Sequence, residues 1–328
     1  MTDDQKKRVL LCGTQYGQIY LPAIAQEQEL ELVGILARGS DRSVRLSEQQ
    51  GVSLYTDIEQ IDEIVDIACV AINENIGTPL ADRFLQQGIA TLVEHPMSIN
   101  NIRQLLDTAQ EYSSRCHINT HFSTIAPVAD FIQHSQKLNQ RSRPKIINVS
   151  CNSRTLFSSL DILMRCLGCF TLKDLSVNAV GDYRNCTMLL DDIPCTLTYQ
   201  QWRYKQDNSM DSPLGHQITV TYPDGVLSLG GTYGPSLWFP LVSGDLPLSM
   251  HLCQNLQSEQ SEFATVSTMR YWRQQANQMA LREISRQQHS EADHHSNKYQ
   301  IYLCELWTSL ISQLGTHTIE MPDHLKGA

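Results

Sequence analysis

Short apolar runs alternate with amphipathic segments over the first 122 residues of the chain. The apolar runs are nearly continuous, as in strands buried on both faces, and they occupy residues 8–13, 30–38, 66–73, 89–96 and 116–122. Segments with helical periodicity separate them, at residues 18–27, 44–51, 78–88 and 98–113. Buried strands joined by helices form a parallel sheet, and right-handed crossovers make that sheet doubly wound. We therefore predict a Rossmann-like α/β domain over residues 1–122.

The pattern changes after about residue 122. Helical segments flank an apolar strand at 146–151, strand-like runs with turn signals follow from 172 to 242, and helical patterns return between 261 and 314. No Gly/Ser-rich linker separates the two halves. We predict that residues 123–328 form an α+β domain with an open mixed β-sheet.

Charge and composition exclude several classes of function. The chain has 25 Lys and Arg residues against 35 Asp and Glu residues, and its formal net charge of -10 disfavours nucleic-acid binding. No apolar run is long enough to span a bilayer, and the start of the chain does not resemble a signal peptide. We expect a cytoplasmic protein without membrane contacts.

The ten cysteines are scattered along the chain, which is typical of reduced, buried side chains. Cys166 and Cys169 have CxxC spacing, but they lie in a leucine-rich run without a second pair. Core packing is therefore favoured over a zinc or redox site, and we predict no metal.

The turn after the first strand is the first candidate site. It consists of Gly13, Thr14, Gln15, Tyr16 and Gly17, a shortened GxxxG in place of the full GxGxxG motif. Glycine at such a turn lets the backbone approach a pyrophosphate and lets a helix pack on the strand. The motif is unspecific alone, but its place in the first βαβ unit favours dinucleotide binding by these five residues.

The end of the second strand bears on the choice between NADH and NADPH. NAD-binding folds usually have Asp or Glu there, whereas this chain has Arg38, followed by Ser40, Arg42 and Ser43. Guanidinium groups and hydroxyls suit a 2′-phosphate, and the one carboxylate, Asp41, falls after the expected position. We predict NADPH as the cofactor; the alternative is an exposed basic loop.

Polar residues also end the next buried strands. Asn73 ends the run 66–73, and Glu94 and His95 lie at the end of the run 89–96. Carboxyl ends of parallel strands face the ligand crevice, so all three are candidates for the cofactor site. A histidine there titrates near neutrality and can act as a general acid, although a lone histidine is more often structural.

Together these segments resemble the glucose–fructose oxidoreductase-like (Gfo/Idh/MocA) dehydrogenases, which have a Rossmann domain followed by an open-faced α/β domain. That family has Glu-Lys-Pro where this chain has Glu94-His95-Pro96, and its His-x-x-Asp motif corresponds to Ser158 through Asp161. The lysine and histidine used by sugar dehydrogenases are thus replaced by His95 and Ser158. The resemblance implies the fold but not the sugar chemistry.

One branch of that family is more similar, the thiazolinyl imine reductases of siderophore biosynthesis (yersiniabactin and pyochelin type). They have a shortened glycine turn followed by a Tyr-Leu pair, here Tyr20-Leu21, and the Glu-His-Pro variant. The resemblance implies NADPH-dependent reduction of a thiazoline C=N bond to a thiazolidine. It also implies a substrate tethered to a nonribosomal peptide synthetase carrier domain, and a homodimer.

Reduction of the ring requires a proton at nitrogen, and His95 is the first candidate donor, with His121 the second. The resemblance implies a tyrosine where this chain has Phe122, and a strand through both residues would point His121 and Phe122 to opposite faces. Phe122 and Asp161 are assigned to the substrate site, although Asp161 serves packing equally well.

Two other functions remain consistent with the sequence. An NADPH-dependent oxidoreductase of the same fold that acts on a free small carbonyl or sugar-like substrate is disfavoured by His95 and Ser158. A non-catalytic NADPH-binding regulator is favoured by the missing third glycine and by Phe122. The regulator would bind NADPH without oxidising it.

Overall fold

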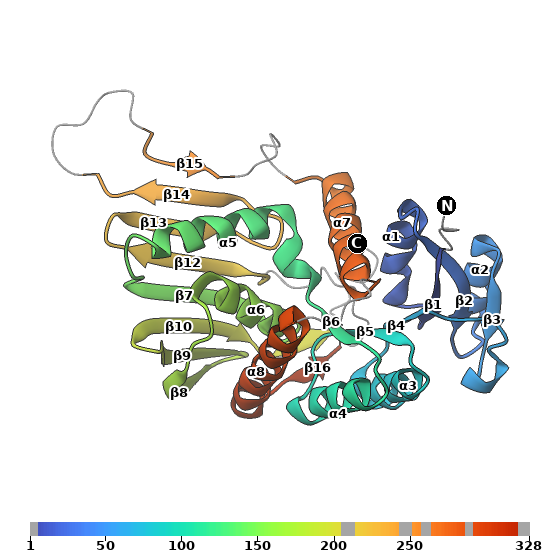
Figure 1. Ribbon diagram of the computed structural model, residues 1–328. Helices are drawn as coiled ribbons and strands as arrows, with labels where there is room; N and C mark the ends of the chain where they lie inside the picture. Colours follow the sequence, from blue (N-terminus) through green and yellow to red (C-terminus); the bar gives the residue numbers. More distant parts are fainter. Residues whose placement is uncertain (1–5, 205–213, 243–250, 257–263, 286–290, 321–328) are drawn as a thin grey trace. The chain divides into compact units, whose positions relative to one another are not determined.

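The computed structural model describes residues 6–204, 214–242, 251–256, 264–285 and 291–320 (Figure 1). Two compact units share the chain. The first comprises residues 1–121 and 270–304, and the second comprises residues 122–269 and 305–328.

The first unit contains a six-stranded parallel sheet in the order β3-β2-β1-β4-β5-β6, which confirms the predicted doubly wound fold. Its strands are β1 (Lys7–Cys12), β2 (Leu30–Leu36), β3 (Ser53–Tyr55), β4 (Ile67–Val70), β5 (Ala90–Glu94) and β6 (Cys116–Asn119). The connecting helices are η1 (Gly17–Tyr20), α1 (Leu21–Gln26), α2 (Asp41–Gln50), η2 (Ile58–Gln60), α3 (Glu74–Gln86) and α4 (Ile99–Glu111). Strand order reverses between β1 and β4, and in such sheets ligands bind at the carboxyl ends of the strands that flank this point.

Two late helices also belong to this unit: α7 (Val266–Ser285) and most of α8 (Glu291–Leu314). Leu281 and Ile284 of α7 lie in the same buried apolar cluster as Val9 of β1. The backbone N–H of Ile118 in β6 donates to Gln300 Oε1 of α8 at 2.7 Å. The sequence alone predicts that this segment lies in the second domain, because helical periodicity does not reveal which sheet a helix covers.

The second unit is built on an eight-stranded sheet in the order β15-β14-β13-β12-β7-β10-β9-β8. Its strands are β7 (Ile146–Asn152), β8 (Leu172–Val180), β9 (Tyr183–Leu190), β10 (Ile193–Gln200), β12 (Gln217–Tyr222), β13 (Gly225–Leu229), β14 (Ser236–Pro240) and β15 (Gln254–Asn255). β7 and β10 are parallel and the other neighbours are antiparallel, as predicted for a mixed sheet. β11 (Trp202–Tyr204) and β16 (His317–Ile319) form a separate two-stranded parallel sheet.

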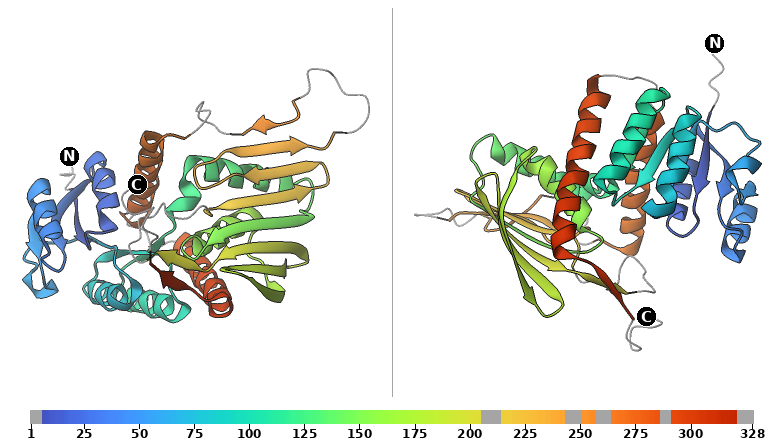
Figure 2. Two further views of the ribbon diagram at one scale, coloured as in Figure 1. Left: turned by 180° about the vertical axis from the view of Figure 1, so that it is seen from behind. Right: turned by 90° about the horizontal axis from the view of Figure 1, so that it is seen from below.

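Two helices, α5 (Ala126–Asn139) and α6 (Leu156–Leu167), lie against one face of this sheet (Figure 2). β12 and β13 alternate buried and half-buried residues, which is the pattern of a sheet with one covered face. α6 is buried on nearly every side, and its ten buried residues, out of twelve, include Ser158 and Asp161. The helix is therefore held in place by packing rather than by surface contacts.

The strand predicted at residues 116–122 is shorter than expected. β6 ends at Asn119, and His121–Thr124 form a 3-10 helix, η3, in which the Ile125 N–H donates to the Phe122 carbonyl at 3.3 Å. The alternating geometry of a strand therefore does not apply to His121 and Phe122. The turn lies where polar side chains, His121, Ser123 and Thr124, come shortly before Pro127 in the first turn of α5.

The CxxC pair consists of a buried Cys166 and an exposed Cys169, and all ten cysteines are free thiols. Burial raises the pKa of the Cys166 thiol to about 12, so it carries no thiolate at neutral pH. Within the part of the chain that the structure describes, no helix is both long and apolar enough to cross a membrane.

Candidate active site

The turn contains two glycines, Gly13 and Gly17, and the position of Gly13 fits only glycine. Gly13 has a φ of +94°, and a Cβ there would lie 2.7 Å from the Ala71 carbonyl oxygen at the end of β4. A Cβ on Gly17 would lie 3.0 Å from the Leu11 side chain, so this glycine lets η1 pack directly on β1. The Gly13 N–H donates to the Leu36 carbonyl at 2.9 Å, which ties the turn to the end of β2. A bare backbone at the sheet's reversal point fits a dinucleotide.

The side chains between these glycines differ in exposure. Gln15 is exposed, whereas Thr14 and Tyr16 are half-buried. Gln18 Nε2 donates to the Gln15 carbonyl at 3.0 Å and the Ile19 N–H donates to the Tyr16 carbonyl at 3.1 Å. These bonds fix the predicted cofactor turn as a defined loop.

The basic segment after β2 divides into two groups. Arg38 and Arg42 are exposed and lie on either side of the start of α2. Ser40 caps that helix by accepting from the Ser43 N–H, and the buried Ser43 hydroxyl donates to the Ser40 carbonyl at 2.7 Å. Ser43 therefore serves the helix cap, whereas the side chains of Arg38 and Arg42 are exposed to solvent.

Asn73 is exposed and caps α3, with its Oδ1 accepting from the Ile76 N–H at 3.4 Å. It follows β4 directly, two residues after Ala71, whose carbonyl lies against Gly13. This places Asn73 at the same sheet edge as the glycine turn.

Glu94 ends β5 inside a network of polar side chains. The Tyr20 hydroxyl donates to Glu94 Oε1, and Asn119 Nδ2 lies 3.2 Å from the same oxygen. Asn119, at the paired position of β6, also donates to Asn277 Oδ1 of α7 at 2.9 Å. The network links η1, β5, β6 and α7 beneath His95.

Burial raises the pKa of the Glu94 carboxyl to about 7, although the bonds from Tyr20 and Asn119 oppose this shift. A raised pKa means that the folded state binds the proton more tightly than the unfolded state. The protonated carboxyl therefore contributes stability that is fully present below about pH 4.5 and is lost as pH rises through about 7.

The Glu94→Gln variant is predicted to abolish this pH dependence, since an amide keeps the Tyr20 bond and never ionises. Relative to wild type, its free energy of unfolding should rise by about 3 kcal/mol between pH 5 and pH 8. Urea denaturation at both pH values measures the change, with Glu111→Gln on the surface of α4 as the matched control. An equal pH dependence in wild type and Glu94→Gln would contradict the prediction.

His95 follows Glu94 and is fixed by its own hydrogen bond. Its Nδ1–H donates to the Asn119 carbonyl at 2.6 Å, which fixes the orientation of the ring and assigns proton exchange to Nε2. Its ring lies beside that of His121, with centroids 5.7 Å apart, and His121 Nε2 lies 3.5 Å from the Tyr16 hydroxyl. The structure thus brings both predicted proton donors together at the ends of β5 and β6.

Glu94, His95 and His121 also form the one group among the described residues whose side chains could hold a metal ion, with ligand atoms within 4.8 Å of one another. The sequence predicted no metal. A carboxylate and two imidazoles are metal ligands, but the same groups equally suit the transfer of protons.

The predicted substrate residues lie in the second unit. The Phe122 ring packs on the ring of His216, with centroids 4.8 Å apart. His216 is fully buried between two hydroxyls: its Nε2 lies 2.6 Å from Ser158 Oγ and its Nδ1 lies 2.8 Å from Thr232 Oγ1. An imidazole from the start of β12 therefore contacts Ser158, the residue at the position of the related family's histidine.

Asp161 is fully buried, and both its carboxylate oxygens accept from Arg165 Nε at 3.0 Å, one turn further along α6. This ion pair within one helix compensates the buried charge. Its place in the substrate site stays a prediction.

Several residues of the site are not predicted from the sequence. Asn277 and His216 lie far along the chain from their partners, the former 158 residues from Asn119, and nothing local marks them. Asn119 could have been found, since it ends a buried strand just as Glu94 does.

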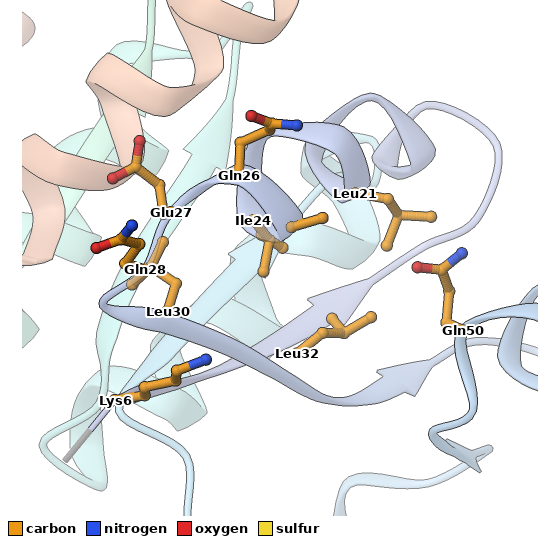
Figure 3. A pocket seen from close by; sticks show the side chains of 10 residues that line it. Lys6, Leu21, Ile24, Gln26, Glu27, Gln28, Leu30, Leu32 and Gln50 are labelled. Carbon is orange, nitrogen blue, oxygen red and sulfur yellow. The ribbon is translucent and has the colours of Figure 1, made fainter.

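A separate cavity of about 330 Å³ lies elsewhere in the first unit (Figure 3). Lys6, just before β1, and Leu30, at the start of β2, contribute to its walls. These are amino ends of strands, opposite to the edge that carries His95, so we assign the cavity no part in the site.

Comparison with known proteins agrees with this geometry. Residues 7–120 match the oxidoreductase family GFO_IDH_MocA, described as an NAD-binding Rossmann fold, and residues 142–239 match the C-terminal domain of the Irp3-like thiazolinyl imine reductases. No curated protein sequence matches the chain.

Solved structures show the same architecture. A dehydrogenase from Chromobacterium violaceum is 12% identical with a TM-score of 0.68, and the match covers 94% of this chain and 97% of that one. A 3-ketoreductase from Actinomadura kijaniata, in complex with TDP-benzene and NADP, is 14% identical with a TM-score of 0.68, covering 97% and 100%. The biliverdin reductase of Synechocystis, in complex with biliverdin and NADP+, is 14% identical with a TM-score of 0.65, covering 92% and 98%.

At these identities the solved structures support the fold alone. The two family matches lie in the two units described above and together cover more than half of the 328 residues. The first unit is thus the NAD(P)-binding domain of an oxidoreductase. The chain belongs to the Gfo/Idh/MocA oxidoreductase family, and its second domain is of the thiazolinyl imine reductase type.

Proposed function

We propose that this protein reduces the C=N bond of a thiazoline ring to a thiazolidine with NADPH. The match of residues 142–239 to thiazolinyl imine reductases carries the proposal, because it specifies a substrate class that the Rossmann domain alone does not. His95 supports it, since imine reduction requires a proton donor at the nitrogen.

The residues of the chain have distinct parts in this reaction. The Gly13–Gly17 turn and the arginines at 38 and 42 would hold the cofactor, which supplies a hydride to the imine carbon when bound. His95 gives its Nε2 proton to the ring nitrogen. The C=N double bond thus becomes a C–N single bond, with a new C–H bond and a new N–H bond. The Nδ1 bond to Asn119 orients the imidazole for this transfer.

We further propose that the substrate arrives as a thioester on a nonribosomal peptide synthetase carrier domain, and that the enzyme acts as a cytoplasmic homodimer. Both are what the resemblance to the thiazolinyl imine reductases of siderophore biosynthesis implies. An enzyme that transfers hydride to a carrier-bound ring needs only the ring to enter its site.

Arg38 and Arg42 provide the choice of NADPH over NADH in this proposal. Their joint replacement by alanine is expected to raise KM for NADPH about 100-fold and to change KM for NADH little, because each lost charge-assisted contact to the 2′-phosphate is worth roughly 1.5 kcal/mol. Steady-state kinetics with both cofactors measures the ratio. The Arg45→Ala variant, also on the exposed side of α2, is the control. Equal losses for both cofactors would rule out the 2′-phosphate contact.

The proposed activity is tested by following absorbance at 340 nm with purified protein, NADPH and a synthetic hydroxyphenyl bis-thiazoline thioester. NADPH oxidation with a thiazolidine product, identified by mass spectrometry, is the expected result. Oxidation with free small carbonyls and not with the thiazoline would reassign the substrate. NADPH binding without turnover on either would indicate a regulator.

A further inference from the structure

Each reduction of a C=N bond consumes one proton, which His95 must recover before the next turnover. The His95 side chain is only 5% exposed and His121 is 2% exposed, so bulk water has little direct contact with either ring. A group nearer to solvent must therefore pass the proton inward.

Tyr16 is positioned for this task. It belongs to the glycine turn, is half-buried, and its hydroxyl lies 3.5 Å from His121 Nε2. The His121 ring in turn lies beside the His95 ring, with centroids 5.7 Å apart, and one ring nitrogen of each residue lies within 4.8 Å of the other. Tyr16, His121 and His95 thus form a row of three proton-carrying side chains, of which Tyr16 is half-buried and His121 is 2% exposed.

We propose that Tyr16 and His121 form a proton relay that reprotonates His95, a role that rests on the proposed imine reduction. Tyr16 and His121 are positioning and relay residues rather than groups that touch the substrate. In this relay the phenolic hydroxyl comes from Tyr16, since Phe122 stands where the resemblance implies a tyrosine.

The chemistry of the three groups permits a balanced transfer. A phenol accepts a proton on oxygen while it gives one up, and an imidazole accepts on one nitrogen and releases from the other. After His95 has given its Nε2 proton to the ring nitrogen, His121 passes a proton to His95, Tyr16 passes one to His121, and water returns one to Tyr16. No oxidant or reductant is required. His95 and Tyr16 end in their starting states, and a ring flip returns His121 from its other neutral tautomer to the starting one.

Glu94 directly precedes His95 at the end of β5, and its Oε2 lies 3.9 Å from His95 Nδ1. Burial raises the pKa of this carboxyl to about 7, so its ionised form becomes populated as pH rises through neutrality. In that form it favours the protonated imidazole and helps His95 to hold the recovered proton.

The Tyr16→Phe variant tests the relay because it removes the hydroxyl and keeps the ring. The expected result is a kcat about tenfold lower, an unchanged KM for NADPH, a larger solvent deuterium isotope effect on kcat, and partial rescue by imidazole buffer. Tyr112→Phe, at an exposed tyrosine after α4, is the matched control. A normal kcat and isotope effect, or a loss confined to KM for NADPH, would overturn the relay.

His121→Gln extends the test and separates the two proposals. If both residues act in one path, the Tyr16→Phe/His121→Gln double variant will be no slower than the slower single variant. If the fold-losses in kcat of the two single variants multiply in the double variant, the relay is overturned. An inactive wild type on the thiazoline thioester would overturn the proposed function and the relay together, whereas an active wild type with a normal Tyr16→Phe variant would overturn the relay alone.

Discussion

The His95→Asn variant is expected to lower kcat for thiazoline reduction by about 10²- to 10³-fold while it binds NADPH normally. General acids contribute effects of this size, and asparagine lacks any group that could replace the titrating Nε2. The substitution is chosen because the asparagine Nδ2 can donate to the Asn119 carbonyl in place of the histidine Nδ1. The variant thus removes the titrating nitrogen and keeps the hydrogen bond that holds the side chain.

Steady-state kinetics gives kcat, and cofactor fluorescence gives the affinity for NADPH. The control is His134→Asn in α5, because His134 Nδ1 also donates to a backbone carbonyl, that of Asp130, at 2.8 Å. The control should retain its full rate. A His95→Asn enzyme with unchanged kcat would show that another group protonates the substrate.

The Gly13→Ala variant is expected to lose about 3 kcal/mol of stability and most of its affinity for NADPH. The residue has a φ of +94°, and its added methyl group would meet the Ala71 carbonyl oxygen at 2.7 Å. Relief of that contact would push the turn away from β4 and change the backbone that faces the cofactor. Urea denaturation and NADPH titration measure the two losses.

Gly88→Ala isolates the cost of backbone conformation. Gly88 has a φ of +77°, but nothing lies within 4 Å of a Cβ there. The Gly88→Ala variant should lose about 1–2 kcal/mol in free energy of unfolding, with no effect on NADPH binding. Equal losses at Gly13 and Gly88 would mean that the close approach to Ala71 has no consequence.

The sequence predicts the first sheet well because its strands are buried on both faces and so appear as continuous apolar runs. It also locates the residues at strand ends, such as Gly13 and Glu94, since parallel strands present their carboxyl ends at one edge. Those positions depend only on local pattern and on the rules of chain crossover.

The rest depends on contacts between distant segments, which periodicity does not encode. The short length of β6 follows from the turn at His121, where local polarity overrides an apolar run. The pairing of Ser158 with His216 and of Asn119 with Asn277 follows from the way strands and helices pack. A single sequence gives no sign of either pair.

The discontinuous first unit has a consequence for biosynthesis. Leu281 and Ile284 complete the apolar cluster around β1, and Gln300 binds the backbone of β6. The ribosome produces these residues only after the whole of the second sheet has been translated. During synthesis, part of the first sheet therefore stays uncovered until α7 and α8 have been made. A fragment that stops at residue 121 lacks the segments that complete its apolar core.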